Sequence, residues 1–119
     1  MQFIEYPRCS TCKKAKKFLV DNKINFVDRN ILEDTPTKDE LYEWLDKYEV
    51  SLPQLFNTSG IKYRELNLKE KKLQMSVDEM ILLLASDGML IKRPLLVTDD
   101  KILIGFKEKE WKLYFKEEK

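Results

Sequence analysis

The opening of the chain restricts the fold most, because its first 31 residues read as strand, helix and strand with a Cys-x-x-Cys pair at the first junction. MQFIEY (residues 1–6) alternates and is rich in residues that favour β-structure, and Pro7 ends it. Residues 11–22 place apolar side chains at helical spacing among lysines, which predicts an amphipathic helix. INFVDRNI (residues 24–31) reads as a second strand. This order favours a right-handed crossover between parallel strands.

The middle of the chain is predicted to be helical. Two capping-box patterns, one that begins at Thr37 and one that begins at Ser76, mark helix starts. The second precedes MILLLA (residues 80–85), which predicts a well-buried helix that ends near Gly88. We therefore expect a helical insertion over about residues 37–88.

The last third of the chain is predicted to add a β-hairpin and a helix. LIKRPLLV (residues 90–97) and KILIGF (residues 101–106) read as two antiparallel strands, and residues 107–115 read as a charged helix. The expected fold class is therefore α/β, with a small mixed sheet flanked by helices. We expect a single domain over residues 1–119, because a chain of this length can bury a sufficient hydrophobic core without covalent cross-links.

Composition and charge narrow the classes of partner. A content of 43% hydrophobic and 36% charged residues fits a soluble globular protein rather than a disordered or membrane protein. No signal peptide or membrane span is predicted, so we expect a cytoplasmic protein. The net charge of +1 provides no overall field that would recruit nucleic acid or a membrane surface. For a chain of this size a monomer is the default expectation.

Cys9 and Cys12 are the only cysteines, and the chain has no histidine. A structural zinc site needs four ligands, and neither a second cysteine pair nor a histidine is present to complete one. We therefore expect no metal and no cofactor, unless two chains share a metal ion. The absence of histidine also excludes His-based acid–base catalysis. A structural disulfide is not favoured in a cytoplasmic domain, whereas two unrelated thiols remain an alternative.

A redox pair is the interpretation that the position of the cysteines favours. At a strand-to-helix junction, the sulfur of Cys9 would face the free N–H groups of the first helical turn, which lowers a thiol pKa below about 8.5. Cys12, one turn further along, would be less exposed and close enough to attack a mixed disulfide at Cys9. C-x-x-C beside a β-α-β pattern is typical of thioredoxin-like proteins. Basic residues surround the pair, either as a solvated helix face or as a positive field: Arg8, Lys13, Lys14, Lys16 and Lys17.

Three stretches resemble the arsenate reductase-like branch of the thioredoxin superfamily, which includes ArsC, Spx and MgsR proteins. They are YPRCSTCKKAKK (residues 6–17), ASDGMLIKRP (residues 85–94) and IGFKE (residues 104–108). The similarity extends over essentially the whole chain and is greatest to the Spx/MgsR group and its small C-x-x-C relatives. The resemblance implies a thioredoxin-like fold with a helical insertion. It also implies a cis peptide between Arg93 and Pro94, with Arg93 near Cys9.

For function, the resemblance and the cysteine pair together favour a thiol–disulfide oxidoreductase. Cys9 would be the nucleophile, Cys12 the resolving thiol, and Arg93 the cation that stabilises the thiolate or an anionic substrate group. Pro94 would shape the substrate-docking loop. The electron donor would be a thiol from the glutathione, glutaredoxin or thioredoxin system.

Arsenate reduction is an alternative for which the arginine set is incomplete. Arsenate reductases of this family use one cysteine, which matches Cys9, and three arginines, of which Arg93 is matched. Asn57 and the Gly105-Phe106 pair take the places of the other two arginines. Each lost charge-assisted hydrogen bond removes about 1.5–3 kcal/mol of oxyanion binding.

A redox-sensing regulator is the other alternative. Spx-type regulators use C-x-x-C as a switch and bind the α-subunit of RNA polymerase. The resemblance places Ser51 and Ser59 where those regulators carry a glycine and an arginine for that contact.

Overall fold

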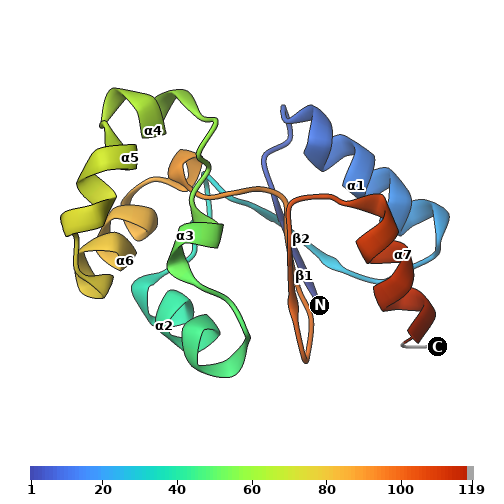
Figure 1. Cartoon of the computed structure of the whole chain (residues 1–119). Helices are drawn as coiled ribbons and strands as arrows, with labels where there is room; N and C mark the ends of the chain where they lie inside the picture. The colour runs from blue at the N-terminus through green and yellow to red at the C-terminus, as the bar shows by residue number, and fades with distance from the viewer. Residues whose placement is uncertain (118–119) are drawn as a thin grey trace.

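The computed structural model describes residues 1–117 and shows a mixed α/β architecture (Figure 1). Within these residues one sheet has four strands in the order β2-β1-β3-β4. The strands are β1 (Gln2–Glu5), β2 (Val27–Asn30), β3 (Leu95–Val97) and β4 (Ile102–Ile104). β1 pairs in parallel with β2, whereas β3 pairs antiparallel with both β1 and β4. The predicted α/β class, the parallel crossover and the late hairpin are confirmed.

Helices cover both faces of the sheet (Figure 1). α1 (Ser10–Asp21) and α7 (Glu108–Glu117) lie on one face, and the helical insert lies on the other. The insert runs from residue 38 to residue 90 between β2 and β3. Its elements are α2 (Lys38–Lys47), α3 (Leu52–Leu55), α4 (Ile61–Glu65), α5 (Leu68–Lys71), η1 (Lys72–Gln74), α6 (Val77–Ser86) and η2 (Gly88–Leu90).

The central strand β1 is buried on both faces because successive side chains of a strand point to opposite sides. Phe3 packs against α1 and α7, and its ring centroid lies 6.4 Å from that of Trp111. Ile4 packs on the other side, in the core shared with the insert. Packing on both faces therefore fixes the end of β1 at Glu5, where the loop that carries Cys9 begins.

The predicted strand at residues 24–31 is shorter than expected. The N–H of Ile24 donates to the carbonyl of Leu19, and Lys23 adopts a positive φ of 56°. A residue with positive φ after the last helical turn, followed by such a return bond, is a common way to end a helix. The first residue of the predicted strand, Ile24, therefore belongs to the turn that closes α1, and β2 begins at Val27.

The predicted strand at residues 90–97 is also wrong in its first half. Ile91 forms an isolated bridge with Phe56, and the N–H of Lys92 donates to the carbonyl of Leu55 at 2.7 Å. These residues pair with the insert rather than with β1, so β3 begins at Leu95.

Helix α6 is less buried than its apolar sequence predicts. Ile81 and Leu84 are fully buried, but Leu82 is 54% exposed. One face of the helix therefore packs on the core and the other faces solvent. No helix among the described residues is both long enough and apolar enough to cross a membrane.

Candidate functional site

Helix α1 begins at the C-x-x-C pair, and Cys9 is its N-cap residue. Cys9 has an extended backbone (φ −82°, ψ 124°), and its Sγ accepts a hydrogen bond of 3.4 Å from the backbone N–H of Cys12. Its carbonyl accepts from the N–H of Lys13 at 3.1 Å, which starts the helical ladder. Ser, Thr, Asp or Asn usually fills this position, so a thiol takes a role that oxygen normally performs. The sulfur thus lies at the positive end of a 12-residue helix.

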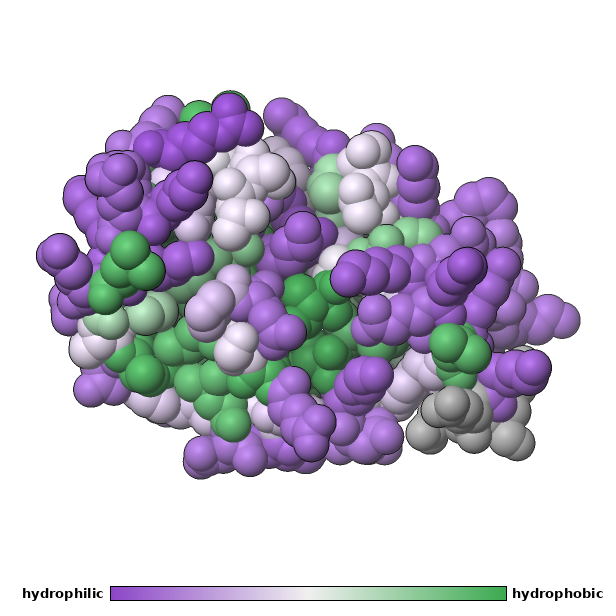
Figure 2. All heavy atoms as spheres, in the orientation of Figure 1, coloured by the Kyte–Doolittle hydropathy of each residue, from purple (hydrophilic) through white to green (hydrophobic). Residues whose placement is uncertain are grey.

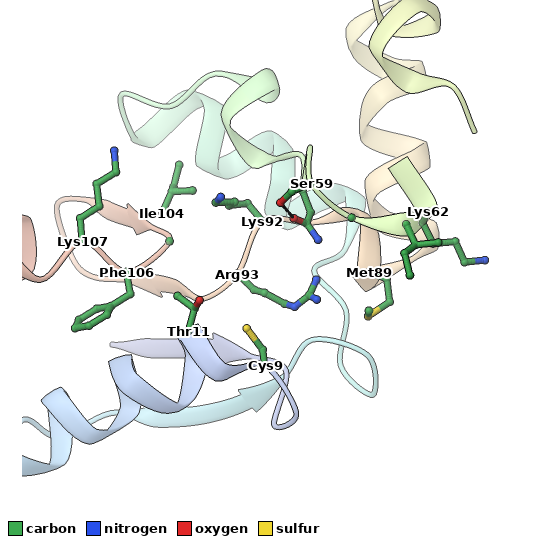
Figure 3. Close-up of a pocket in the computed structure, with 14 residues that line it drawn as sticks. Cys9, Thr11, Ser59, Lys62, Met89, Lys92, Arg93, Ile104, Phe106 and Lys107 are labelled. Carbon is green, nitrogen blue, oxygen red and sulfur yellow. Dashed lines mark hydrogen bonds between the residues drawn. The ribbon is translucent and has the colours of Figure 1, made fainter. Parts of the chain in front are cut away.

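The surroundings of Cys9 favour its thiolate. Partial burial alone would raise the pKa of the thiol, but hydrogen bonds from the backbone and side chain of Cys12 and the positive charge of Arg93 lower it. The net result is a pKa of Cys9 below its ordinary value. The side chain is partly exposed, and its sulfur points into the space shared with Arg93 and Thr11 (Figure 3).

Cys12 has the opposite character. It is fully buried on the inner face of α1, one helical turn from Cys9, and both thiols are free. Burial raises the pKa of the Cys12 thiol to about 12, and the hydrogen bond and charge of Cys9 add to this effect. A hydrogen bond from the backbone N–H of Tyr6 and the charge of Arg93 act in the other direction. The pair therefore combines a partly exposed thiol that ionises readily with a buried thiol that does not.

Arg93 places a cation beside the pair. The Arg93–Pro94 peptide bond is cis, as the resemblance implies, and the side chain extends toward Cys9 (Figure 3). The guanidinium carbon lies 5.3 Å from the centre of the Tyr6 ring, within the range of a cation–π contact. Nε and Nη1 of Arg93 are buried and have no hydrogen-bond partner within residues 1–117. Leaving buried donors without acceptors costs free energy, so a ligand atom that accepts these hydrogen bonds would bind favourably here.

Cys9 and Arg93 open into a hollow of about 510 Å³ (Figure 3). Asn57, Gly105 and Phe106, which the resemblance places where arsenate reductases carry arginines, line this hollow together with Cys9. The remaining contributors come from α1, the insert and both ends of the β3–β4 hairpin: Thr11, Ser59, Gly60, Ile61, Lys62, Met89, Lys92, Ile104 and Lys107.

The other predicted site residues fall into two groups. Pro94 is buried, and its carbonyl accepts from the N–H of Gly105 at 2.8 Å, which ties the cis bond to the second half of the hairpin. Ser51 is the N-cap of α3 and is not among the residues that line the hollow, whereas Ser59 is. No group of three or more His, Cys, Asp or Glu side chains within residues 1–117 is arranged to hold a metal ion.

The basic cluster around the cysteines divides in the structure. Lys16 Nζ lies 2.6 Å from a carboxylate oxygen of Asp28, and Lys17 Nζ lies 2.6 Å from one of Asp21. Arg8, Lys13 and Lys14 are exposed to solvent. None of the five basic residues of this cluster lines the hollow. The cation that acts on Cys9 is thus Arg93, and the cluster is mainly a solvated helix face.

A buried carboxyl group beneath α1 is not evident from the sequence. Glu5 is 3% exposed, and its Oε2 lies 3.3 Å from Nζ of Lys16. Burial, together with a hydrogen bond to Asp28 and the charge of that residue, raises the pKa of Glu5 to about 7, while Lys16 opposes the rise. The alternation of side chains along β1 predicts that Glu5 points inward. Its partners Lys16 and Asp28 lie on α1 and β2, so the sequence around Glu5 does not indicate them.

Lys62, Lys92 and Lys107 also line the hollow and are not identified by sequence reasoning. Lys92 lies in the first strand of the predicted hairpin, two residues before Pro94, and Lys107 directly follows the second strand. The position of the hairpin beside Pro94 is therefore a signal for both. Lys62 comes from α4 of the insert, and no local pattern indicates that this helix returns to Cys9.

Comparisons with known proteins find similar chains over most of the sequence. Residues 4–113 match the ArsC family. The protein YusI of Bacillus subtilis is 50% identical over 111 residues, which cover 93% of this chain and 94% of YusI. The regulatory protein MgsR of Bacillus subtilis is 32% identical, with 89% of this chain and 82% of MgsR covered. The crystal structure of an ArsC family related protein from Bacteroides fragilis superposes with a TM-score of 0.88 at 46% identity, with 94% of each chain covered.

Proposed function

The chain belongs to the ArsC family, and from this premise we propose that it is a thiol–disulfide oxidoreductase with Cys9 and Cys12 as its redox pair. The single observation that carries the proposal is the unequal state of the two thiols. Cys9 is partly exposed at the start of α1 with a lowered pKa, and Cys12 is buried with a raised one. Thiol–disulfide exchange needs this division into an attacking and a resolving thiol.

In the first step, the Cys9 thiolate attacks one sulfur of a substrate disulfide. A new S–S bond joins Cys9 to that sulfur, the substrate S–S bond breaks, and the other sulfur leaves as a thiolate that takes up a proton. Arg93 lowers the pKa of Cys9 before the attack. Its unpaired Nε and Nη1 are also available to an anionic group of the substrate.

In the second step, Cys12 attacks Cys9 in the mixed disulfide. The Cys9–Cys12 bond forms, the substrate sulfur leaves as a thiolate, and the substrate has gained two electrons. Part of the rise in the pKa of Cys12 comes from the hydrogen bond and charge of Cys9. That part disappears once Cys9 is bonded to the substrate, so the resolving thiol ionises more easily when it is needed. Two thiol groups of a donor, from the glutathione, glutaredoxin or thioredoxin system, would then reduce the pair.

Arsenate reduction is supported less well by the same hollow. Arg93 supplies one guanidinium, whereas Asn57 and the Gly105-Phe106 pair supply no charge where the family's reductases have arginines. A multiply charged oxyanion would therefore lose two charge-assisted contacts.

The similarity to MgsR favours one second candidate, a redox-sensing regulator. In that case the same disulfide would change a binding surface, with the RNA polymerase α-subunit as the partner. Ser51 and Ser59 lie on the insert, at the start of α3 and just before α4. Tight binding of that subunit by one redox state, without turnover of a disulfide, would favour this candidate.

The test is the redox midpoint of the Cys9–Cys12 couple, read by alkylation and mass in buffers of defined thiol–disulfide ratio. We expect a two-electron transition between roughly −180 and −300 mV. Cys9→Ser should abolish reduction of bis(2-hydroxyethyl) disulfide, and Cys12→Ser should accumulate a mixed disulfide at Cys9. If no intramolecular disulfide forms at any ratio, or if Cys9→Ser retains full activity, the proposal is wrong.

A further inference from the structure

We propose that the outer edge of β4 is a docking edge for an extended polypeptide with acidic side chains beside its disulfide. The physiological substrates of Cys9 would then be peptides or proteins rather than small disulfides. This inference rests on the proposed function, because it names the substrate class of the same site. It is carried by three features: unpaired backbone groups, a groove that is continuous with the Cys9 hollow, and an excess of positive charge.

The first feature is the free backbone of β4, the edge strand of the sheet. In an antiparallel pair, alternate residues direct their N–H and C=O groups toward the neighbouring strand. The N–H of Gly105 donates to the carbonyl of Pro94, the residue before β3, so the backbone groups of Leu103, two residues earlier, also point toward β3. Ile102 and Ile104 therefore direct their backbone groups away from the sheet, and within residues 1–117 no backbone group outside the sheet forms a hydrogen bond with them. Such an edge is a template for another extended chain.

The second feature is a further hollow of about 390 Å³ along this edge. Ile102 and Ile104 line it, together with side chains of the insert and of α7: Glu49, Gln54 and Glu110. Lys92, Ile104 and Lys107 line both this hollow and the one at Cys9, so the two form one groove. Figure 2 shows apolar atoms near the middle of this face, between the insert and α7, framed by hydrophilic side chains. A small disulfide would use the first hollow, whereas a chain that continues from its cysteine would enter the second.

The third feature is the charge of the groove. Five cationic side chains line the two hollows, against two carboxylates: Lys62, Lys92, Arg93, Lys101 and Lys107 against Glu49 and Glu110. Lys92 and Lys107, at the junction of the two hollows, form no salt bridge within the described residues. Acidic side chains that flank a substrate cysteine would complement this field. A second copy of the chain, paired edge to edge, would instead bring the same lysines together, and like charges disfavour that arrangement.

The decisive experiment uses amide hydrogen exchange in the full-length Cys12→Ser protein. Cys9 would be joined in a mixed disulfide either to an acidic cysteine-containing peptide or to 2-mercaptoethanol. We expect the amides of Ile102 and Ile104 to exchange at least tenfold more slowly in the peptide adduct than in the 2-mercaptoethanol adduct. The amide of Leu103, which already faces β3, is the internal control and should exchange at the same rate in both.

A kinetic experiment tests the charge argument in the protein with both cysteines. Lys101→Glu should lower the kcat/KM for an acidic peptide disulfide, relative to that for bis(2-hydroxyethyl) disulfide, by about fivefold, corresponding to about 1 kcal/mol. Lys109→Glu makes the same charge change on the exposed side of α7 and should leave this ratio unchanged.

The outcomes separate the docking edge from the proposed function. If the peptide adduct forms but Ile102 and Ile104 gain no protection, the docking edge is refuted and the oxidoreductase proposal stands. If neither disulfide reacts with Cys9, the oxidoreductase proposal fails, and the docking edge fails with it. Protection of both amides that rises with protein concentration in the free protein would identify a surface for a second copy instead, which would also overturn the inference.

Discussion

Replacing Glu5 by glutamine is expected to remove most of the loss of stability between pH 4.5 and pH 7. Glu5 ends β1 and is 3% exposed, with Lys16 and Asp28 as its charged neighbours. Burial and Asp28 raise the pKa of its carboxyl group from 4.5 to about 7. The native protein therefore holds a proton on this side chain over a pH range in which the unfolded chain has already released it.

The sign and size of the effect follow from proton linkage. When the native state binds more protons than the unfolded state, the free energy of unfolding falls as the pH rises. The fall begins near the unfolded pKa of 4.5 and is complete once the pH has passed the native value of about 7. At about 1.4 kcal/mol per pH unit, this interval corresponds to a loss of about 3 kcal/mol. Glutamine has the same shape and cannot ionise, so the variant should keep that free energy at pH 7.5.

The assay is urea denaturation with a reducing agent at several values between pH 4.5 and pH 7.5, for the wild-type protein and the Glu5→Gln variant. The difference between the two profiles reports on Glu5 together with Asp28, because the two carboxyl groups share a hydrogen bond. Titrating groups remote from this pair are common to both proteins. Glu43→Gln is the matched control, since Glu43 is exposed on α2 and forms no ion pair within the described residues. Parallel profiles for the wild type and Glu5→Gln across this range would refute the reasoning.

Two further predictions concern the site and the insert. Arg93→Gln should raise the pKa of Cys9 and slow its alkylation by iodoacetamide at pH 7. Lys13 does not line the hollow, so Lys13→Gln should leave the alkylation rate unchanged. Equal alkylation rates in the two variants would contradict the assigned role of Arg93. Gly88→Ala should destabilise the protein by about 1–3 kcal/mol, because an added Cβ would lie 2.2 Å from the backbone carbonyl oxygen of Ile31. An unchanged urea midpoint for that variant would show that the contact relaxes without cost.

The parts of the fold that depend on local pattern were predictable from the sequence. The helical spacing after Cys9 and the capping boxes at Thr37 and Ser76 involve neighbouring residues, and the helices begin as these patterns predict. Strand ends were not predictable, because distant partners set them. Residues 90–97 were predicted as one strand, but Ile91 and Lys92 pair with the insert, so β3 begins only at Leu95.

The candidate site divides in the same way. The proximity of Arg93 to Cys9 was implied by the resemblance to a known family, and the role of Cys9 as a helix cap was expected from its place at the junction. The contribution of Lys62 was not predictable, because it depends on how α4 packs against η2. Partners that are distant in sequence leave no periodic signal, whichever element carries them.

The spacing of the motif itself explains why the two thiols differ. A residue at the N-cap lies outside the helix, whereas the residue three positions later has completed almost one turn and joins the face that points inward. Cys12 shares that face with Ala15 and Leu19, which are fully buried, and so the same helix exposes one thiol and covers the other. Arg93 adds a charge whose two buried donors have no acceptor within residues 1–117. An anion that reaches these donors, whether the Cys9 thiolate or a substrate group, relieves the free-energy penalty of leaving them unpaired. That relief adds to the affinity of the site for the anion.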